Sequence, residues 1–159
     1  MGCWASSFIP QIIAHLPDFP MGLVCFDLHA ARRFFPIPNL VAYNVNQQVL
    51  MGPLGRGFLE DARKAGKKVF VWTVNSESAM RWCIRKDVDG VVTDYPELCR
   101  QLVKTEGPTT TPGSDMNITL SDKMEILKMS LLVMLFGWIF SLKYLPRVKV
   151  EEKSTVKTK

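Results

Sequence analysis

The sequence predicts an α/β fold built on a parallel sheet. Two apolar segments, residues 68–75 and 88–96, each lead into a polar loop, as buried strands do, and residues 77–86 between them have a helical pattern. Two strands joined by a crossover helix lie parallel in one sheet. The carboxyl ends of parallel strands build the functional sites of such folds, so Asn75 and Asp94, which follow these strands, mark a candidate site.

The N-terminal third supplies two further strands. A loop over the first residues leads into a helix within residues 3–16, which Pro17 ends. Short apolar runs at 22–26 and 40–44 are predicted strands, and residues 30–35 between them form a helical turn.

The middle of the chain continues the alternation of helices and strands. A helix is predicted at 56–65, with Gly66 placed as its left-handed C-cap. Strands follow at 68–74 and 90–93, which gives four strands in all. Pro96 suits the first turn of a last helix, over residues 97–103.

Residues 1–103 therefore form one α/β domain, and the rest of the chain differs in composition. Residues 104–120 are a linker rich in Thr, Pro and Gly. The helix predicted at 121–146 has 14 uncharged residues in succession, apolar on all sides. With its flanks it approaches the roughly 20 residues that span a bilayer, so we expect a transmembrane anchor. The alternative is a helix packed on a soluble core. Residues 147–159 are a basic tail.

Charge and cysteine content indicate which kinds of partner and which cellular compartment to expect. The net charge is +5 and the isoelectric point about 9.1, and much of the basic excess lies after residue 142. A basic tail beside an apolar helix favours binding to anionic lipid headgroups. The sequence has no aromatic-rich basic face, so we expect no nucleic acid binding. The four cysteines lack the spacing of a zinc site and suggest reduced thiols in a cytosol-facing protein. They are Cys3, Cys25, Cys83 and Cys99.

Two motifs carry a family resemblance. V-F-V-W-T-V-N at 69–75 and V-D-G-V-V-T-D-Y-P at 88–96 resemble the last two barrel strands of the glycerophosphodiester phosphodiesterase family, most closely its fungal phosphatidylglycerol phospholipase C type. The similarity runs from about residue 3 to residue 102. It implies the C-terminal half of a TIM-type (β/α)8 barrel of the phospholipase C-like phosphodiesterases. Such a barrel needs about 250 residues, and this chain has 159.

The resemblance also indicates what this chain lacks. The family uses two histidines for acid–base catalysis, one in an H-R-G segment, and carboxylate segments that hold a divalent metal, Mg²⁺ or Ca²⁺. None of these segments occurs in the sequence. His15 and His29 lack the motif context and are expected to be structural or surface residues. We therefore assign no catalytic and no metal-binding residue to this chain.

Three residues are the candidates for substrate binding: Trp72, Asn75 and Tyr43. By resemblance, Trp72 and Asn75 end a strand that borders the family's pocket. The alternatives are a core tryptophan and a helix-capping asparagine. Tyr43, with Asn44, ends another predicted strand and is a weaker candidate. Asp94 is expected to cap the following helix.

These observations predict a membrane-anchored phosphodiesterase-like protein that acts on glycerophospholipids such as phosphatidylglycerol, here as a fragment without the catalytic half. The alternative is a non-catalytic, membrane-tethered protein that binds a lipid headgroup or a second half-barrel chain. A short, moderately apolar segment with a basic tail suits the endoplasmic reticulum, the mitochondrial outer membrane or lipid droplets, and we expect the barrel part to face the cytosol. Residue 87 is aspartate where the family has glycine, and aspartate tolerates a positive φ there better than most residues.

Overall fold

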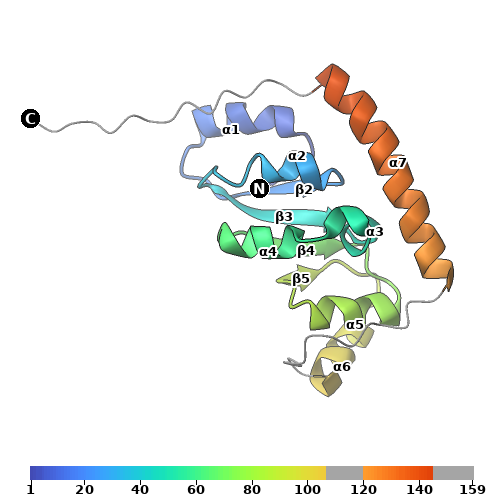
Figure 1. The fold of residues 1–159 in the computed structure, drawn as a ribbon. Helices are drawn as coiled ribbons and strands as arrows, with labels where there is room; N and C mark the ends of the chain where they lie inside the picture. The colour runs from blue at the N-terminus through green and yellow to red at the C-terminus, as the bar shows by residue number, and fades with distance from the viewer. Residues whose placement is uncertain (107–119, 145–159) are drawn as a thin grey trace, which may run out of the picture.

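Five parallel strands form a single sheet in the computed structural model, which describes residues 1–106 and 120–144 (Figure 1). The spatial order of the strands follows the sequence, and each strand pairs in parallel with the next. The strands are β1 (Gly2–Cys3), β2 (Met21–Cys25), β3 (Leu40–Asn46), β4 (Lys68–Trp72) and β5 (Gly90–Val91).

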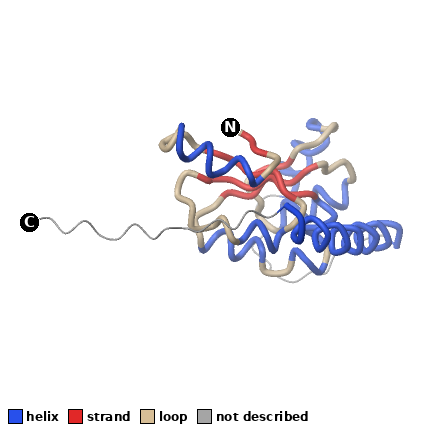
Figure 2. The backbone as a smooth tube through the Cα atoms, turned by 90° about the horizontal axis from the view of Figure 1, so that it is seen from above, coloured by secondary structure: helices blue, strands red, loops and turns tan. Residues whose placement is uncertain are grey.

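Helices connect successive strands, and a long helix closes the described chain (Figure 2). They are α1 (Ile9–His15), α2 (Leu28–Arg32), α3 (Gln47–Met51), α4 (Phe58–Lys64), α5 (Glu77–Arg85), α6 (Pro96–Glu106) and α7 (Leu120–Tyr144), with 3-10 turns at Ser6–Phe8 and Pro53–Gly55. The predicted parallel α/β arrangement is thus confirmed. Strand β1 and helix α3 were not predicted, and β3 runs two residues beyond its expected end.

Side chains at the helix starts explain where several helices begin. Asp27, Asn46 and Ser76 each accept a hydrogen bond from a backbone N–H in the first turn of α2, α3 and α5, respectively. At the other end of α4, Gly66 has φ +66°, which confirms the predicted left-handed cap. Asp87 has φ +50°, the conformation expected where the family has glycine.

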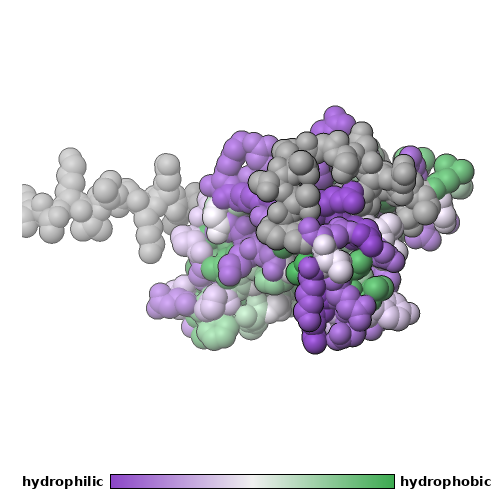
Figure 3. Space-filling model, turned by 90° about the horizontal axis from the view of Figure 1, so that it is seen from below, coloured by the Kyte–Doolittle hydropathy of each residue, from purple (hydrophilic) through white to green (hydrophobic). Residues whose placement is uncertain are grey.

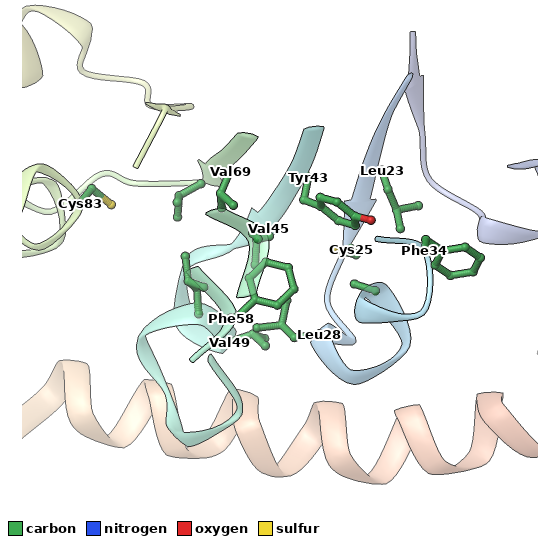
Figure 4. Packing of buried hydrophobic residues seen from close by; sticks show 14 of the residues in the cluster. Leu23, Cys25, Leu28, Phe34, Tyr43, Val45, Val49, Phe58, Val69 and Cys83 are labelled. Carbon is green, nitrogen blue, oxygen red and sulfur yellow. The ribbon is translucent and has the colours of Figure 1, made fainter. Parts of the chain in front are cut away.

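The core lies between one face of the sheet and the helices. Leu23, Tyr43 and Val69 occupy matching positions on β2, β3 and β4, and each is at most 3% exposed. Phe58 of α4 packs against Tyr43 in this layer (Figure 4). Full burial of each large apolar side chain stabilises the fold by about 1.5–3 kcal/mol. The same face therefore holds the helices to the sheet.

The opposite face of the sheet is only half-buried. Val24, Asn44 and Phe70 share a register position on neighbouring strands, with Gly90 beside them on β5. In a closed barrel, side chains of this face would fill the interior. A Cβ at Gly90 would lie 2.8 Å from the Phe70 ring, so glycine permits the close packing of the two strands.

Helix α7 packs against α3 through one side. Ser130 is 2% exposed, and Met129 and Val133 contact the core cluster. Within residues 1–106 and 120–144, no helix is long and apolar enough to cross a membrane, so the expected transmembrane span at 121–146 is not confirmed. Four of the first nine residues of α7 are charged, which shortens its apolar part.

The predicted basic tail, and all of the predicted linker except residues 104–106 and 120, fall outside the described residues. Helix α6 continues to residue 106, beyond the predicted domain end at 103.

Candidate functional site

The ends of β4 and β5 lie side by side at the carboxyl edge of the sheet. Phe70 pairs with Gly90 and Val71 with Val91. The pairing continues past both strands, because the Val92 N–H donates to the Val71 carbonyl (2.8 Å) and the Val74 N–H to the Val92 carbonyl (2.9 Å). The two polar segments that follow are thereby held next to each other.

Asn75 and Asp94 are the centre of this arrangement. The Asn75 Nδ2 donates to Asp94 Oδ2 at 2.6 Å. Asn75 Oδ1 accepts from the Asp94 backbone N–H (3.0 Å) and from the Thr93 hydroxyl (3.2 Å). Both side chains are exposed. One amide N–H is used within the pair, which leaves the second N–H of Asn75 and the lone pairs of Asp94 for a polar ligand.

The structure answers the capping alternative for Asn75. The side chain that caps α5 belongs to Ser76, not to Asn75. Asp94 lies two residues before Pro96, where α6 begins, and its carboxylate accepts from Asn75. The two side chains are therefore joined to each other at the strand ends.

Trp72 lies at the end of β4 in an aromatic cluster. Its indole Nε1 donates to the Asn44 carbonyl at 3.0 Å, which fixes the ring. Trp4 and Phe26 meet it edge to face, with ring centroids 5.5 Å and 5.3 Å away. Trp4 is 66% exposed and Phe26 43%, while Trp72 is half-buried. The trio presents an apolar surface at the same edge as Asn75.

Tyr43 lies elsewhere than expected. It is fully buried between sheet and helices, where it packs against Phe35 and Phe58 at centroid distances of 5.2 Å and 6.0 Å. Strand β3 continues to Asn46, so position 43 is inside the strand and points to the helix side (Figure 4). Burial, with a smaller contribution from Cys25, raises the pKa of the Tyr43 hydroxyl. Tyr43 is part of the core and does not line a surface with Trp72.

The two histidines are separate surface residues. His15 ends α1 and His29 lies in α2, and both are exposed. Among the described residues, no three metal-ligating side chains of the His, Cys, Asp and Glu types come together. The residues of this edge therefore do not fit the divalent metal that the family resemblance implies.

Sequence reasoning missed two members of the site, Trp4 and Phe26. Each directly follows a strand, as Trp72 ends one, but β1 was not predicted, so nothing marked position 4 as a strand end. Asn44, a weaker candidate, contributes its backbone carbonyl to Trp72. Its side-chain Oδ1 is buried without a hydrogen-bond partner in the described structure.

The fold and the position of the candidate site together define the structural class of the protein. Five parallel strands in sequential order, with helical crossovers and no reversal of strand order, are the arrangement of a (β/α) barrel and not of a doubly wound sheet. Polar and aromatic groups at the carboxyl edge are where barrel proteins carry their sites.

Comparisons with known proteins narrow this class. A solved structure described as a glycerophosphoryl diester phosphodiesterase of Silicibacter pomeroyi matches with a TM-score of 0.56 and 19% identity, covering 70% of this chain and 39% of that one, which supports the fold. The model of the glycerophosphoryl diester phosphodiesterase family matches residues 27–98. A glycerophosphodiester phosphodiesterase of Caldanaerobacter subterraneus subsp. tengcongensis is 41% identical over 49 residues, which are 31% of this chain and 20% of that protein.

The segment 27–98 is thus similar to the glycerophosphodiester phosphodiesterase family, and it contains Trp72, Asn75 and Asp94. The matched part spans a fifth of the length of the curated relative.

Proposed function

We propose that this chain forms one wall of the substrate pocket of a phosphodiesterase that hydrolyses glycerophospholipids such as phosphatidylglycerol. In this reaction, cleavage of the phosphodiester releases diacylglycerol and a phosphorylated headgroup. The observation that carries the proposal is the Asn75–Asp94 pair at the carboxyl edge, 2.6 Å apart, within the family-matched segment.

The chemistry of the edge suits a headgroup of this kind. The free amide N–H of Asn75 can donate to a phosphate oxygen, and Asp94 can accept from a glycerol hydroxyl. Trp72, Trp4 and Phe26 offer an apolar surface for the glycerol backbone or the start of the acyl chains. The wall would thus bind and orient the substrate, a role in which correct placement lowers the barrier.

The acid–base pair and the divalent metal, Mg²⁺ or Ca²⁺, belong in this proposal to other strands of a complete barrel. We expect residues 1–159 alone to bind the headgroup without hydrolysing it. Release of phosphorylated headgroup from phosphatidylglycerol by the purified chain, dependent on Mg²⁺ or Ca²⁺, would overturn that expectation.

Calorimetric titration with glycerophosphoglycerol, the water-soluble headgroup portion, tests whether the proposed pocket wall binds the headgroup. Wild-type chain should bind, and Asn75→Ala should weaken binding by about fivefold or more, since a hydrogen bond contributes about 1 kcal/mol. Gln101→Ala is the matched control, because it removes an exposed amide on α6, away from the strand ends. Equal affinities for all three proteins would contradict the proposal.

A non-catalytic role is the second candidate, and the half-buried sheet face favours it. In the described structure β1 and β5 each pair with one strand only, and the face with Val24 and Phe70 is only half-buried. A second half-barrel chain could pair with these edges and cover that face. Light scattering of a mixture with such a chain would show a joint complex if this role holds, and separate species if it does not.

For the complete protein we propose an intracellular membrane as the location, either endoplasmic reticulum, mitochondrial outer membrane or lipid droplet, with the α/β part facing the cytosol. The free cysteines and the basic C-terminal sequence support this proposal. Fractionation of cells that express the chain with a C-terminal tag tests it, and recovery away from all three membranes would contradict it.

A further inference from the structure

Helix α7 exposes a broad apolar surface. Seven large apolar side chains between residues 127 and 139 are 44–60% exposed. They are Leu127, Leu131, Leu132, Met134, Leu135, Phe136 and Ile139. Soluble monomers seldom expose a continuous apolar patch of this kind unless it contacts a partner. In Figure 3 hydrophobic side chains gather at the right-hand end of the molecule, where α7 projects in Figure 2.

The inner side of α7 packs closely against the residue that follows α3. A Cβ on Gly52, the residue after α3, would lie 2.6 Å from Ser130 Oγ and 3.2 Å from Ile126 Cγ2. Ile126, Ser130 and Val133 are spaced three and four apart and form one side of the helix. Helix α3 follows β3 directly, so this contact holds α7 at the carboxyl edge of the sheet (Figure 1).

The outer side has a composition that favours lipid over protein. Met124, Lys128, Leu131, Leu135 and Ile139 follow at intervals of three and four residues, so they share the side turned away from Gly52. Lys128 is exposed among these apolar neighbours. In a protein interface its charge would be buried at considerable cost, whereas at a lipid surface a lysine extends its amine to the phosphate groups.

The charge of the following sequence agrees with an anionic surface. Residues 143–159 contain six basic and two acidic residues, a net charge of +4. Basic residues next to an apolar helix strengthen its binding to anionic lipids, by electrostatic attraction added to apolar burial.

We propose that the outer side of α7 docks on an anionic lipid surface, with the helix lying in the interface and not across the bilayer. The docked helix then holds the carboxyl edge, with Asn75 and Trp72, about one helix diameter, or about 10 Å, from the lipid headgroups. This inference concerns the membrane partner of the proposed phosphodiesterase function, but docking by itself requires only α7.

Co-sedimentation of the full chain with vesicles tests the docking. Vesicles of phosphatidylcholine alone are compared with vesicles of equal parts phosphatidylcholine and phosphatidylserine, an anionic lipid that is not the proposed substrate. The double variant Leu131→Gln, Leu135→Gln removes apolar contact without changing charge. The matched control is Leu16→Gln, Val103→Gln, which replaces two apolar residues of similar exposure, 46% and 51%, on other elements.

We expect wild-type chain and the control to bind the phosphatidylserine vesicles, and the double variant to bind at least about tenfold more weakly. Lys128→Gln should reduce the preference for phosphatidylserine over pure phosphatidylcholine by about fivefold. Asn75→Ala should bind these vesicles like wild type, which separates docking from headgroup recognition.

Two results would overturn the proposal. One is that the wild-type chain sediments with neither kind of vesicle, or that the double variant in α7 sediments as well as wild type. The other is a dimer, seen by light scattering, that the same double substitution converts to monomer while vesicle binding is absent. In that case a second copy of the chain occupies the apolar side of α7.

Discussion

The Asn75 amide donates a hydrogen bond of 2.6 Å to the Asp94 carboxylate across the ends of two neighbouring strands. The residues are 19 positions apart in the sequence, and the β4–β5 pairing brings them together. Asn75 also accepts from the Asp94 backbone N–H, so amide and carboxylate hold one fixed arrangement. In the proposed pocket wall, such a fixed polar pair would be preorganised, which reduces the cost of ordering when a ligand binds.

Replacing Asn75 tests how far this pair also stabilises the fold. Asn75→Ala should lower the free energy of unfolding by about 1–2 kcal/mol, because three exposed hydrogen bonds are lost. Asn75→Asp should be the more destabilising change, because it replaces the donating amide by a second carboxylate that faces Asp94. Urea titrations of both variants at pH 7 measure this. An Asn75→Asp variant as stable as Asn75→Ala would refute the pairing with Asp94.

The indole donor of Trp72 makes a separable contribution. Trp72→Phe removes the hydrogen bond to the Asn44 carbonyl but keeps a ring beside Trp4 and Phe26, so we expect a loss of about 1 kcal/mol. Trp72→Ala also removes the aromatic contacts and should cost about 3 kcal/mol. Thermal unfolding of both variants gives the comparison. Equal losses would mean that the aromatic cluster contributes nothing.

Gly52 should control the attachment of α7. Gly52→Ala places a methyl group 2.6 Å from Ser130 Oγ and 3.1 Å from the Gln48 carbonyl, and should weaken the α7 contact by about 1–3 kcal/mol. Hydrogen exchange of α7 amides should then accelerate while the amides of β3 and β4 stay protected. Gly2→Ala is the control, because its Cβ would meet nothing within 4 Å. Unchanged exchange in α7 would contradict the observed packing.

Two buried thiols make stability depend on alkaline pH. Burial raises the pKa of Cys25 and of Cys83 from 9.0 to about 12, with smaller contributions from Asp27 and from Cys99. The folded state thus keeps these protons more tightly than the unfolded state does. The stabilisation is complete below about pH 9 and falls as pH rises toward 12, by roughly 1 kcal/mol per pH unit for each thiol.

Denaturant titrations at pH 8 and pH 10 should show this fall, and the double variant Cys25→Ala, Cys83→Ala should reduce the slope. At pH 8 a thiol reagent should modify Cys25 and Cys83 only as fast as the chain unfolds. Rapid modification of both thiols in the native protein would show that they are not buried.

The regular parts of the fold were predictable because their local signals agree. The strand over 68–74 and the helix over 77–86 appear as β4 and α5 within a few residues, since apolar runs, the Ser76 cap and the turn residues all favour the same elements. Gly66 and Asp87 have the positive φ values that their positions suggested.

The missed elements have weak local patterns. Strand β1 has two residues and exists through its parallel pairing with Gly22 and Leu23, a contact that no local pattern reveals. Tyr43 was expected at a strand end, but the strand continues through two asparagines, and the alternation of sides along β3 then directs its ring into the core.

The site was predictable in part. Trp72 and Asn75 stood out because they follow an apolar run, and both lie at the carboxyl edge. The partnership of Asn75 with Asp94, and that of Trp72 with Trp4 and Phe26, depends on tertiary pairing. The apolar length of α7 favoured a membrane span, but charges in its first turns and its contact with α3 give it a packed side and an exposed side.

Nuclear magnetic resonance of the indole N–H groups can show headgroup binding at the strand ends, because Trp72 lies at the proposed headgroup wall and Trp82 lies in α5 as an internal reference. On titration of the full chain with glycerophosphoglycerol, we expect a saturable shift of the Trp72 Nε1–H resonance, an unmoved Trp82 resonance, and loss of the shift in Asn75→Ala. An unmoved Trp72 resonance, or equal shifts of Trp72 and Trp82, would contradict headgroup binding at this wall.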